Sequence, residues 1–134
     1  MANRSEAEWT ELANEGRRIL QRVAREESLT DYGIFNKELA ESTGLPAFDL
    51  NTDRGRADIS ALLVRIAERD REAGAGYMLT SLVKLSGQNH PGKGFFTLAA
   101  QEDLHDDAER EMDFWARQVG LTHAAHKRGR AGQS

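Results

Sequence analysis

The middle of the chain, residues 32–98, constrains the fold more than any other part of the sequence. Residues 32–45 read YGIFNKELAESTGL, in which apolar positions at helical spacing lead to a glycine suited to a helix C-cap. A second helical pattern follows. Residues 78–85 then carry β-favouring side chains in partial alternation, and a polar turn leads into PGKGFF at residues 91–96. Residues 93–96 would form either a short returning strand or the start of a helix. This order predicts two helices joined as a helix-turn-helix, followed by a short β-ribbon.

A helix-turn-helix followed by a ribbon is the outline of a winged helix, a fold that most often holds DNA. Ser5 and Glu8 form a capping-box pattern ahead of an apolar stripe in residues 6–27, which predicts a long first helix weakened in its middle by Gly16. Residues 104–119 predict a last helix. We therefore expect a mainly α protein with a small β-ribbon, a winged helix-turn-helix flanked by long N- and C-terminal helices. The expected parts are an N-terminal helix in residues 1–30, a winged-helix-like core in 31–100, an acidic C-terminal helix in 101–121 and a basic flexible tail in 122–134.

Capping residues predict the ends of the two inner helices. The second helix is best defined from Asn36, with Asn36 or Asp31 available as its N-cap. Asp53 or Asp58 would cap a third helix, which runs to Glu72 and ends at a Gly-Ala-Gly sequence.

Composition is typical of a soluble protein with one domain. The 134 residues suffice for one hydrophobic core, and the absence of cysteine excludes thiol chemistry and a disulfide framework. No apolar run approaches the roughly 20 residues that span a bilayer, and the polar N-terminal residues do not form a signal peptide. We therefore expect a cytoplasmic protein of a bacterium or a phage-infected cell, with no membrane partner.

Two motifs resemble known families. The YG…KELA…GLP pattern of residues 32–46 resembles the helix-turn-helix opening in the C-terminal domain of alkylguanine-DNA alkyltransferases. The catalytic Pro-Cys-His-Arg motif of that family has no counterpart in this cysteine-free chain, so alkyl transfer is excluded. The LTSLV sequence at residues 79–83, together with PGKGFF at 91–96, is similar to a "LLSALVV…PGKGFF" pattern in small bacterial proteins. The second resemblance implies a winged-helix-like fold, but it implies no activity and no catalytic residues.

The third helix of a winged helix usually enters the major groove of DNA through its N-terminal residues. Here these residues include Arg54, Arg56 and Ser60, and an arginine at such a position reads a guanine edge or binds a phosphate. Asp53 and Asp58 lie beside them. A capped, salt-bridged helix start is therefore an equally good interpretation of this sequence.

The predicted wing supplies a second set of candidate DNA contacts. Lys84, Asn89, His90 and Lys93 would face the phosphate backbone or the minor groove. Glycines on both sides of Lys93 would let backbone N–H groups approach an anion, although tight turning explains them equally well. The alternative for the whole segment is a plain hairpin loop.

The net charge of −4 argues against the DNA hypothesis, because a dedicated DNA binder usually has a basic face. Residues 101–118 hold seven acids and two arginines, whereas residues 121–134 hold no acid. The leading hypothesis is a regulatory or accessory protein that binds double-stranded DNA. The alternative is a non-catalytic protein-interaction module, in which the acidic helix with Phe114 and Trp115 binds a basic protein partner. Another interpretation of the acidic helix is a face that only contacts solvent. A homodimer through the first and last helices is compatible with either hypothesis.

Catalytic and metal-binding signatures are weak. His123 and His126 lie one helical turn apart but have no acidic or cysteine ligand nearby in the sequence. The His-Asp-Asp sequence at residues 105–107 is more typical of acids at a helix start than of a nuclease. Walker, Rossmann and nucleophile-elbow patterns are absent from the sequence. We therefore expect a protein that is not an enzyme and has no cofactor and no metal.

Overall fold

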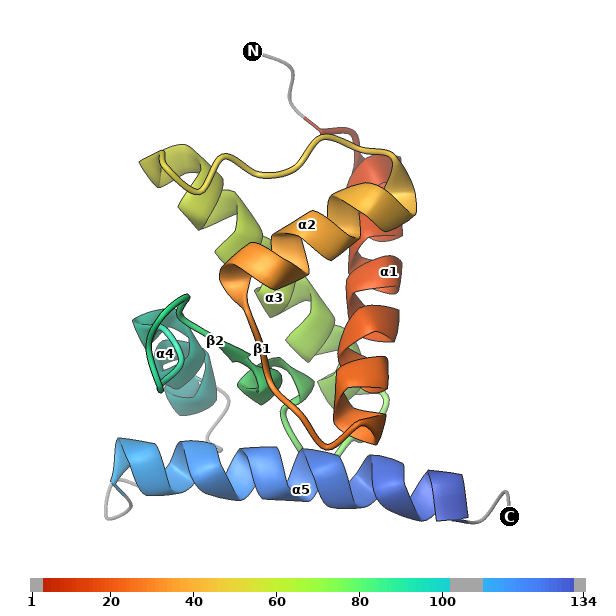
Figure 1. The fold of residues 1–134 in the computed structure, drawn as a ribbon, viewed down its shortest axis with the longest axis vertical. Coiled ribbons are helices and arrows are strands. Elements are labelled where there is room, and N and C mark those ends of the chain that lie inside the picture. The colour runs from red at the N-terminus through yellow and green to blue at the C-terminus, as the bar shows by residue number, and fades with distance from the viewer. Residues whose placement is uncertain (1–3, 102–109, 132–134) are drawn as a thin grey trace.

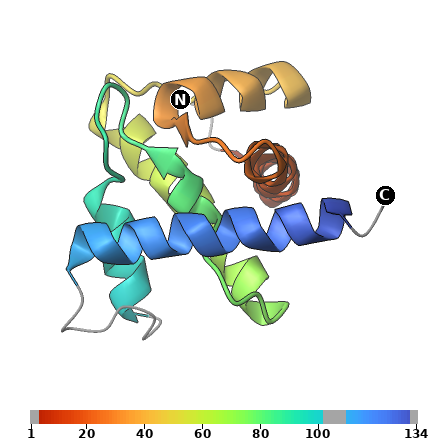
Figure 2. The same ribbon diagram turned by 60° about the horizontal axis from the view of Figure 1, so that its bottom comes forward.

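The computed structural model describes residues 4–101 and 110–131, which form a mainly helical protein (Figure 1). Three helices, α1, α2 and α3, pack together in the upper part of the view, and α5 crosses beneath them (Figures 1 and 2). The elements are α1 (Glu6–Arg25), β1 (Thr30–Asp31), α2 (Tyr32–Thr43), α3 (Asp53–Glu72), the 3₁₀ helix η1 (Leu79–Leu82), β2 (Val83–Lys84), α4 (Lys93–Gln101) and α5 (Glu111–Ala131). None of the helices in the described parts of the chain combines the length and apolar composition that crossing a membrane requires.

The capping box predicted for the first helix is confirmed. The Ser5 hydroxyl accepts a hydrogen bond from the Glu8 backbone N–H at 3.1 Å, and the Glu8 carboxylate accepts one from the Ser5 N–H at 2.8 Å. These bonds satisfy backbone donors that no helical carbonyl can reach. The helix ends at Arg25, and Glu27 just beyond it has a φ of 53°.

Gly16 lies at the point where α1, α2 and α3 meet. A Cβ atom at this position would lie 2.9 Å from Ile66 Cδ1 of α3 and 3.1 Å from Phe35 Cζ of α2. The glycine that weakens the helix locally therefore lets the three helices pack closely.

The second helix starts earlier than its sequence predicts. Asp31 is the N-cap and accepts from the Ile34 N–H at 2.9 Å, while Gly44 ends the helix with a φ of 74°, as predicted. Asn36 is not a cap, because its buried amide donates to the Phe48 carbonyl at 2.8 Å and accepts from the Phe48 N–H at 2.9 Å. Asn36 thus anchors the connection between α2 and α3.

The third helix is capped by Thr52, not by Asp53 or Asp58. Its hydroxyl accepts from the Gly55 N–H at 3.0 Å. Gly55 also packs against the preceding turn so closely that a Cβ atom would lie 1.9 Å from the Asp49 carbonyl oxygen.

The predicted antiparallel β-ribbon is wrong. The two strands are parallel, with Thr30 opposite Val83 and Asp31 opposite Lys84. Most of the expected first strand forms the buried helix η1, and PGKGFF opens α4, the helical alternative to a returning strand. Neither side of the ribbon is therefore present as an extended hairpin, and the wing that it would form is not observed.

Three side chains of α5 hold the backbone around η1, which explains why this segment is compact. Trp115 Nε1 donates to the Ser81 carbonyl at 2.7 Å, and Gln118 accepts from the Met78 N–H at 2.9 Å. The buried Thr122 hydroxyl lies 3.2 Å from the Met78 carbonyl oxygen. These tertiary bonds replace the ladder that a ribbon would have supplied.

The last helix does not end near residue 121, as the sequence predicts, but continues to Ala131. The His123 ring lies 2.9 Å from the Ser28 carbonyl oxygen, and the His126 ring makes an edge contact with Tyr77. Contacts with distant parts of the chain therefore keep residues 122–126 packed, contrary to the flexible tail predicted there. Residues 102–109 of the predicted acidic segment, which include the His-Asp-Asp sequence and five of its seven acids, lie outside the described residues.

Candidate nucleic-acid interface

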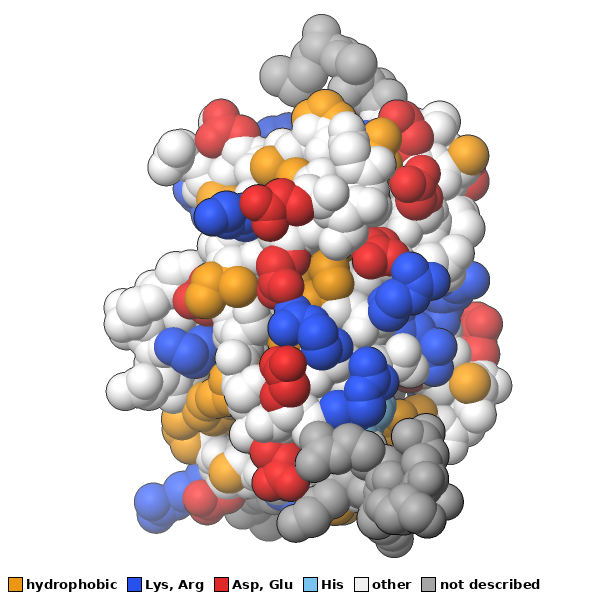
Figure 3. Space-filling view, turned by 45° about the vertical axis from the view of Figure 1, so that its right-hand side comes forward, with side chains coloured by type: hydrophobic (Ala, Val, Ile, Leu, Met, Phe, Trp, Pro, Cys, Tyr) orange, Lys and Arg blue, Asp and Glu red, His pale blue; other side chains and the backbone are white. Residues whose placement is uncertain are grey.

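A polar groove of about 380 Å³ lies between α1 and α3. Its lining comprises Asn14, Arg17, Arg18, Gln21, Arg69 and Ala73, which we call the arginine groove. Every lining residue except the alanine carries side-chain N–H donors, and none is a carboxylate. Figure 3 shows Lys and Arg side chains gathered on the face that α1 covers, with carboxylates between them.

Helical spacing produces this arrangement. Asn14, Arg17, Arg18 and Gln21 follow one another on one side of α1, because residues three and four apart are neighbours on a helix surface. Arg69 comes from α3, which packs against the same side of α1. The groove therefore joins residues about fifty positions apart in the sequence. Arg17 and Asp70, which are hydrogen-bonded to each other, are 53 residues apart in the chain.

A buried carboxylate fixes one of the arginines. Arg17 Nε donates to Asp70 Oδ1 at 2.6 Å, and Asp70 is only 3% exposed. Because this bond uses Nε, the two terminal nitrogens of the guanidinium are not consumed by it. Arg17 therefore presents a fork whose stem is held in place, which is the geometry that binds a phosphate through two parallel bonds.

The other two arginines of the groove have weaker or uncharged partners. The Arg18 side chain is 71% exposed and pairs with Glu15 one turn earlier on the same helix. Arg69 donates to the neutral side-chain amide of Asn14. An exposed ion pair contributes little free energy in water, so an incoming anion displaces such a partner at small cost.

A second hollow of about 230 Å³ continues from the groove and shares Arg69 with it. Its lining is mixed in charge, since Glu68 and Glu72 lie beside Arg65 and Arg69. Arg65 also forms a 2.8 Å ion pair with Glu6, and this hydrogen bond, together with the positive charge, lowers the pKa of Glu6. The first hollow is therefore the better anion site of the two.

The arginines predicted from the sequence have local partners at the start of α3. Arg54 Nε lies 3.5 Å from Asp58 Oδ2, and Arg56 pairs with Asp53 while donating to the Leu50 carbonyl at 2.9 Å. This is the salt-bridged helix start that the sequence allowed as the alternative. Ser60, one turn further on, is exposed and lines a different, apolar pocket.

The predicted wing residues lie in or beside the loop between β2 and α4, since Lys84 ends β2 and Lys93 begins α4. Lys84 donates to the Gln88 carbonyl at 3.0 Å, and the His90 ring lies 3.0 Å from the Pro91 carbonyl oxygen. Asn89 is exposed, whereas the side chain of Lys93 lies outside the described part. The loop thus brings Lys84, Asn89 and His90 together, but its polar groups are partly used in closing the loop.

Phe114 and Trp115, predicted to contact a partner protein, instead lie in the core. Phe114 is fully buried against Phe95, with the ring centroids 5.7 Å apart, and Trp115 is 9% exposed. The prediction placed them on a surface because the helix is acidic overall. The structure shows that α5 turns its aromatic side chains inward and leaves Glu111 and Asp113, the acids of this helix, exposed.

The two histidines considered as metal ligands have other contacts. His123 approaches the Ser28 carbonyl, and the His126 ring lies 2.9 Å from the Thr122 carbonyl oxygen. Within residues 4–101 and 110–131, no group of three or more His, Asp or Glu side chains is arranged to hold a metal ion.

The groove residues were missed because each half of the groove is ordinary by itself. The arginines of α1 are typical of the solvent-exposed face of an amphipathic helix, and Arg69 is typical of the basic residues found in the last turn of a helix. The available signal was the pairing of two donor-rich helix faces, which requires knowing that α1 packs on α3. Comparison with protein-family models, with curated proteins and with solved structures gives no match for this chain.

Proposed function

We propose that this protein is a non-catalytic DNA-binding module whose contact surface is the arginine groove. The observation that carries the proposal is a hollow of about 380 Å³ with three arginines, two side-chain amides and no carboxylate in its lining. Phosphate oxygens are acceptors only, and they match a lining that consists of donors.

Double-stranded DNA is the ligand that this surface favours within the proposal. Arginine and amide side chains are among the groups by which proteins hold the DNA backbone. The groove runs between two long helices, so its donors form a row along the surface and are not gathered at one point. The binding is expected to be electrostatic and weakly dependent on base sequence.

The net charge of −4 shapes the expected behaviour. Acids surrounding the groove oppose a polyanion at long range, and salt screens both this repulsion and the local attraction. Binding therefore depends on close contacts in the groove, and it should be modest at physiological salt.

Fluorescence anisotropy with a labelled random duplex tests the proposal. The informative variant is the double substitution Arg18→Gln and Arg69→Gln, which removes two charges and leaves the Arg17–Asp70 pair intact. The matched control is Arg54→Gln and Arg56→Gln, which removes the same charge from the site predicted by the sequence. Each lost phosphate contact lowers the slope of log affinity against log salt by about 0.9, so the groove variant should lose about 2.

The outcomes separate the two surfaces. The proposal predicts at least a tenfold loss of affinity for the groove variant and a change of less than about threefold for the control. A loss confined to the control would place the interface at the start of α3. Absence of duplex binding by the native protein at about 50 mM salt would overturn DNA binding altogether.

A further inference from the structure

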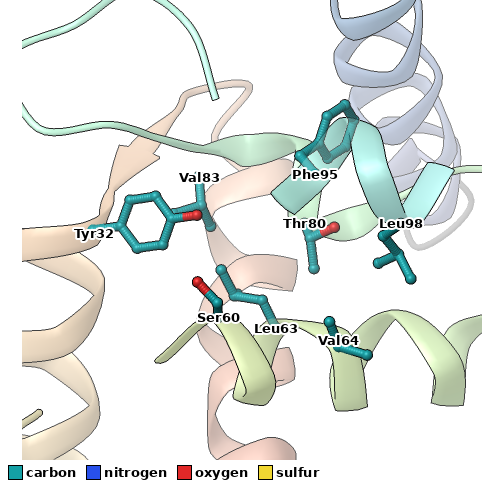
Figure 4. A pocket seen from close by; sticks show the side chains of 8 residues that line it. All are labelled: Tyr32, Ser60, Leu63, Val64, Thr80, Val83, Phe95 and Leu98. Carbon is teal, nitrogen blue, oxygen red and sulfur yellow. The ribbon is translucent and has the colours of Figure 1, made fainter. Parts of the chain in front are cut away.

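A small pocket lies between α3 and α4, on a different surface of α3 from the arginine groove (Figure 4). Five elements contribute to its wall, whose residues are Tyr32, Ser60, Leu63, Val64, Thr80, Val83, Phe95 and Leu98. The lining contains five apolar side chains, three hydroxyl groups and no charged group. This composition excludes an ion as the occupant, because a buried charge would have no partner there.

Thr80 gives the pocket a specific polar group. Its residue is 5% exposed, and its hydroxyl has no hydrogen-bond partner among the described residues. A buried hydroxyl without a partner is destabilising, so an apolar side chain would be favoured at this position if the pocket had only a packing role. Thr122 provides the contrast, because its equally buried hydroxyl lies 2.7 Å from the Gln118 carbonyl oxygen.

The other two hydroxyl groups occupy the opposite side. Figure 4 shows the hydroxyl ends of Tyr32 and Ser60 near each other, whereas Thr80 lies toward Phe95 and Leu98. Ser60 is exposed and marks the side from which the pocket opens, while Thr80 lies at its buried end. A ligand that enters beside Ser60 would therefore pass between the apolar walls before it reaches the Thr80 hydroxyl.

The volume of the pocket limits the size of its occupant. It is about 40 Å³, and one water-sized group occupies roughly 10–15 Å³ on this measure. About three such groups fit, which corresponds to the carbon body of a short-chain alcohol or ketone.

We propose that this pocket binds a small uncharged alcohol or ketone, with the apolar body between Leu63, Val64 and Leu98 and the oxygen on the Thr80 hydroxyl. The threonine donates to the ligand oxygen, which supplies the partner that the protein itself does not provide. This binding site does not depend on DNA binding, because none of its lining residues belongs to the arginine groove.

Heteronuclear NMR titration of the full chain with 2-propanol tests the site. Saturable shifts are expected for the backbone amides of Thr80, Val83 and Leu98, with a dissociation constant on the order of millimolar for so small a ligand. Xenon serves as a second probe, because it reports the apolar cavity without needing a hydrogen bond.

Two matched threonine variants make the test specific. Thr80→Val keeps the shape of the side chain and should abolish saturable 2-propanol binding, keep xenon binding, and leave Tm unchanged or raised. Thr122→Val should lower Tm, since it removes a hydroxyl that has a partner, and it should leave 2-propanol binding unchanged.

Three results would overturn the proposal. The first is the absence of saturable shifts in the native protein at the highest 2-propanol concentration at which it stays folded. The second is equal affinity in the native and Thr80→Val proteins. The third is a fall in Tm for Thr80→Val as large as that for Thr122→Val, which would show that the Thr80 hydroxyl already has a partner.

Discussion

At the scale of single residues, Gly16 and Gly120 have opposite roles although both lie inside helices. A Cβ atom at Gly16 would meet Ile66 and Phe35 within 3.1 Å, whereas a Cβ atom at Gly120 of α5 would have no neighbour within 4 Å. Substitution by alanine therefore tests packing at Gly16 and helix propensity at Gly120.

We expect Gly16→Ala to destabilise the protein and Gly120→Ala to stabilise it. Alanine improves helix propensity by up to about 1 kcal/mol at either position, but overpacking at Gly16 costs about 1–3 kcal/mol. Chemical denaturation should show a net loss of about 1 kcal/mol for Gly16→Ala and a gain of about 0.5–1 kcal/mol for Gly120→Ala. Equal gains at both positions would show that the three helices do not meet tightly at Gly16.

The two tyrosines predict a loss of stability at alkaline pH. Burial raises the pKa of Tyr32, and burial together with the nearby Asp70 charge raises the pKa of Tyr77, in each case from an ordinary value of 10.0. The folded protein thus holds these protons more tightly than the unfolded chain does. The resulting stability is fully present below pH 10 and is lost as the pH rises through the higher folded-state pKa values.

Phenolate absorbance measured against pH checks this prediction. The folded protein should ionise at higher pH than the chain unfolded in urea, and the free energy of unfolding should decline over the same range. Tyr32→Phe should remove part of the decline. Coincident titrations of the folded and unfolded protein would contradict the burial of both hydroxyls.

At the scale of elements, the sequence predicts what local contacts determine. Ser5 and Glu8 are three residues apart, so their capping box is visible in the sequence, and Gly44 marks the end of α2 for the same reason. The segment from Met78 to Leu82 was misread, because bonds from Trp115 and Gln118 override its β-propensity. Thirty to forty residues separate these partners, so the pattern of residues within the segment gives no sign of the bonds.

The C-terminal part of α5 provides a test at this scale. A chain that ends at Leu121 lacks Thr122, whose hydroxyl reaches the Met78 carbonyl, and His123, whose ring reaches Ser28. We expect a lower Tm in thermal unfolding followed by circular dichroism, because the backbone around η1 loses one of the three α5 side chains that hold it and the Ser28 carbonyl loses its contact with His123. An unchanged Tm would favour the flexible tail predicted from the sequence.

At the scale of the whole molecule, charge distribution matters more than net charge. The chain is acidic overall, yet its packing places Arg17, Arg18 and Arg69 around one hollow and holds one of them through buried Asp70. The sequence predicts candidate arginines only at the start of α3, because the third helix of a winged helix usually contacts DNA through its N-terminal residues. The groove could not be predicted because it exists only once α1 and α3 are packed together.

The most direct test of DNA binding in the arginine groove is to locate bound DNA by NMR. The arginine side-chain Nε–Hε signals are recorded during titration with a short duplex. If DNA binds in the arginine groove, the signals of Arg17, Arg18 and Arg69 shift first and furthest, and added salt reverses the shifts. Small changes are expected for Arg54 and Arg56, because neither residue lines the groove. Shifts concentrated at Arg54 and Arg56, with the groove signals unmoved, would contradict the arginine groove as the DNA-binding surface.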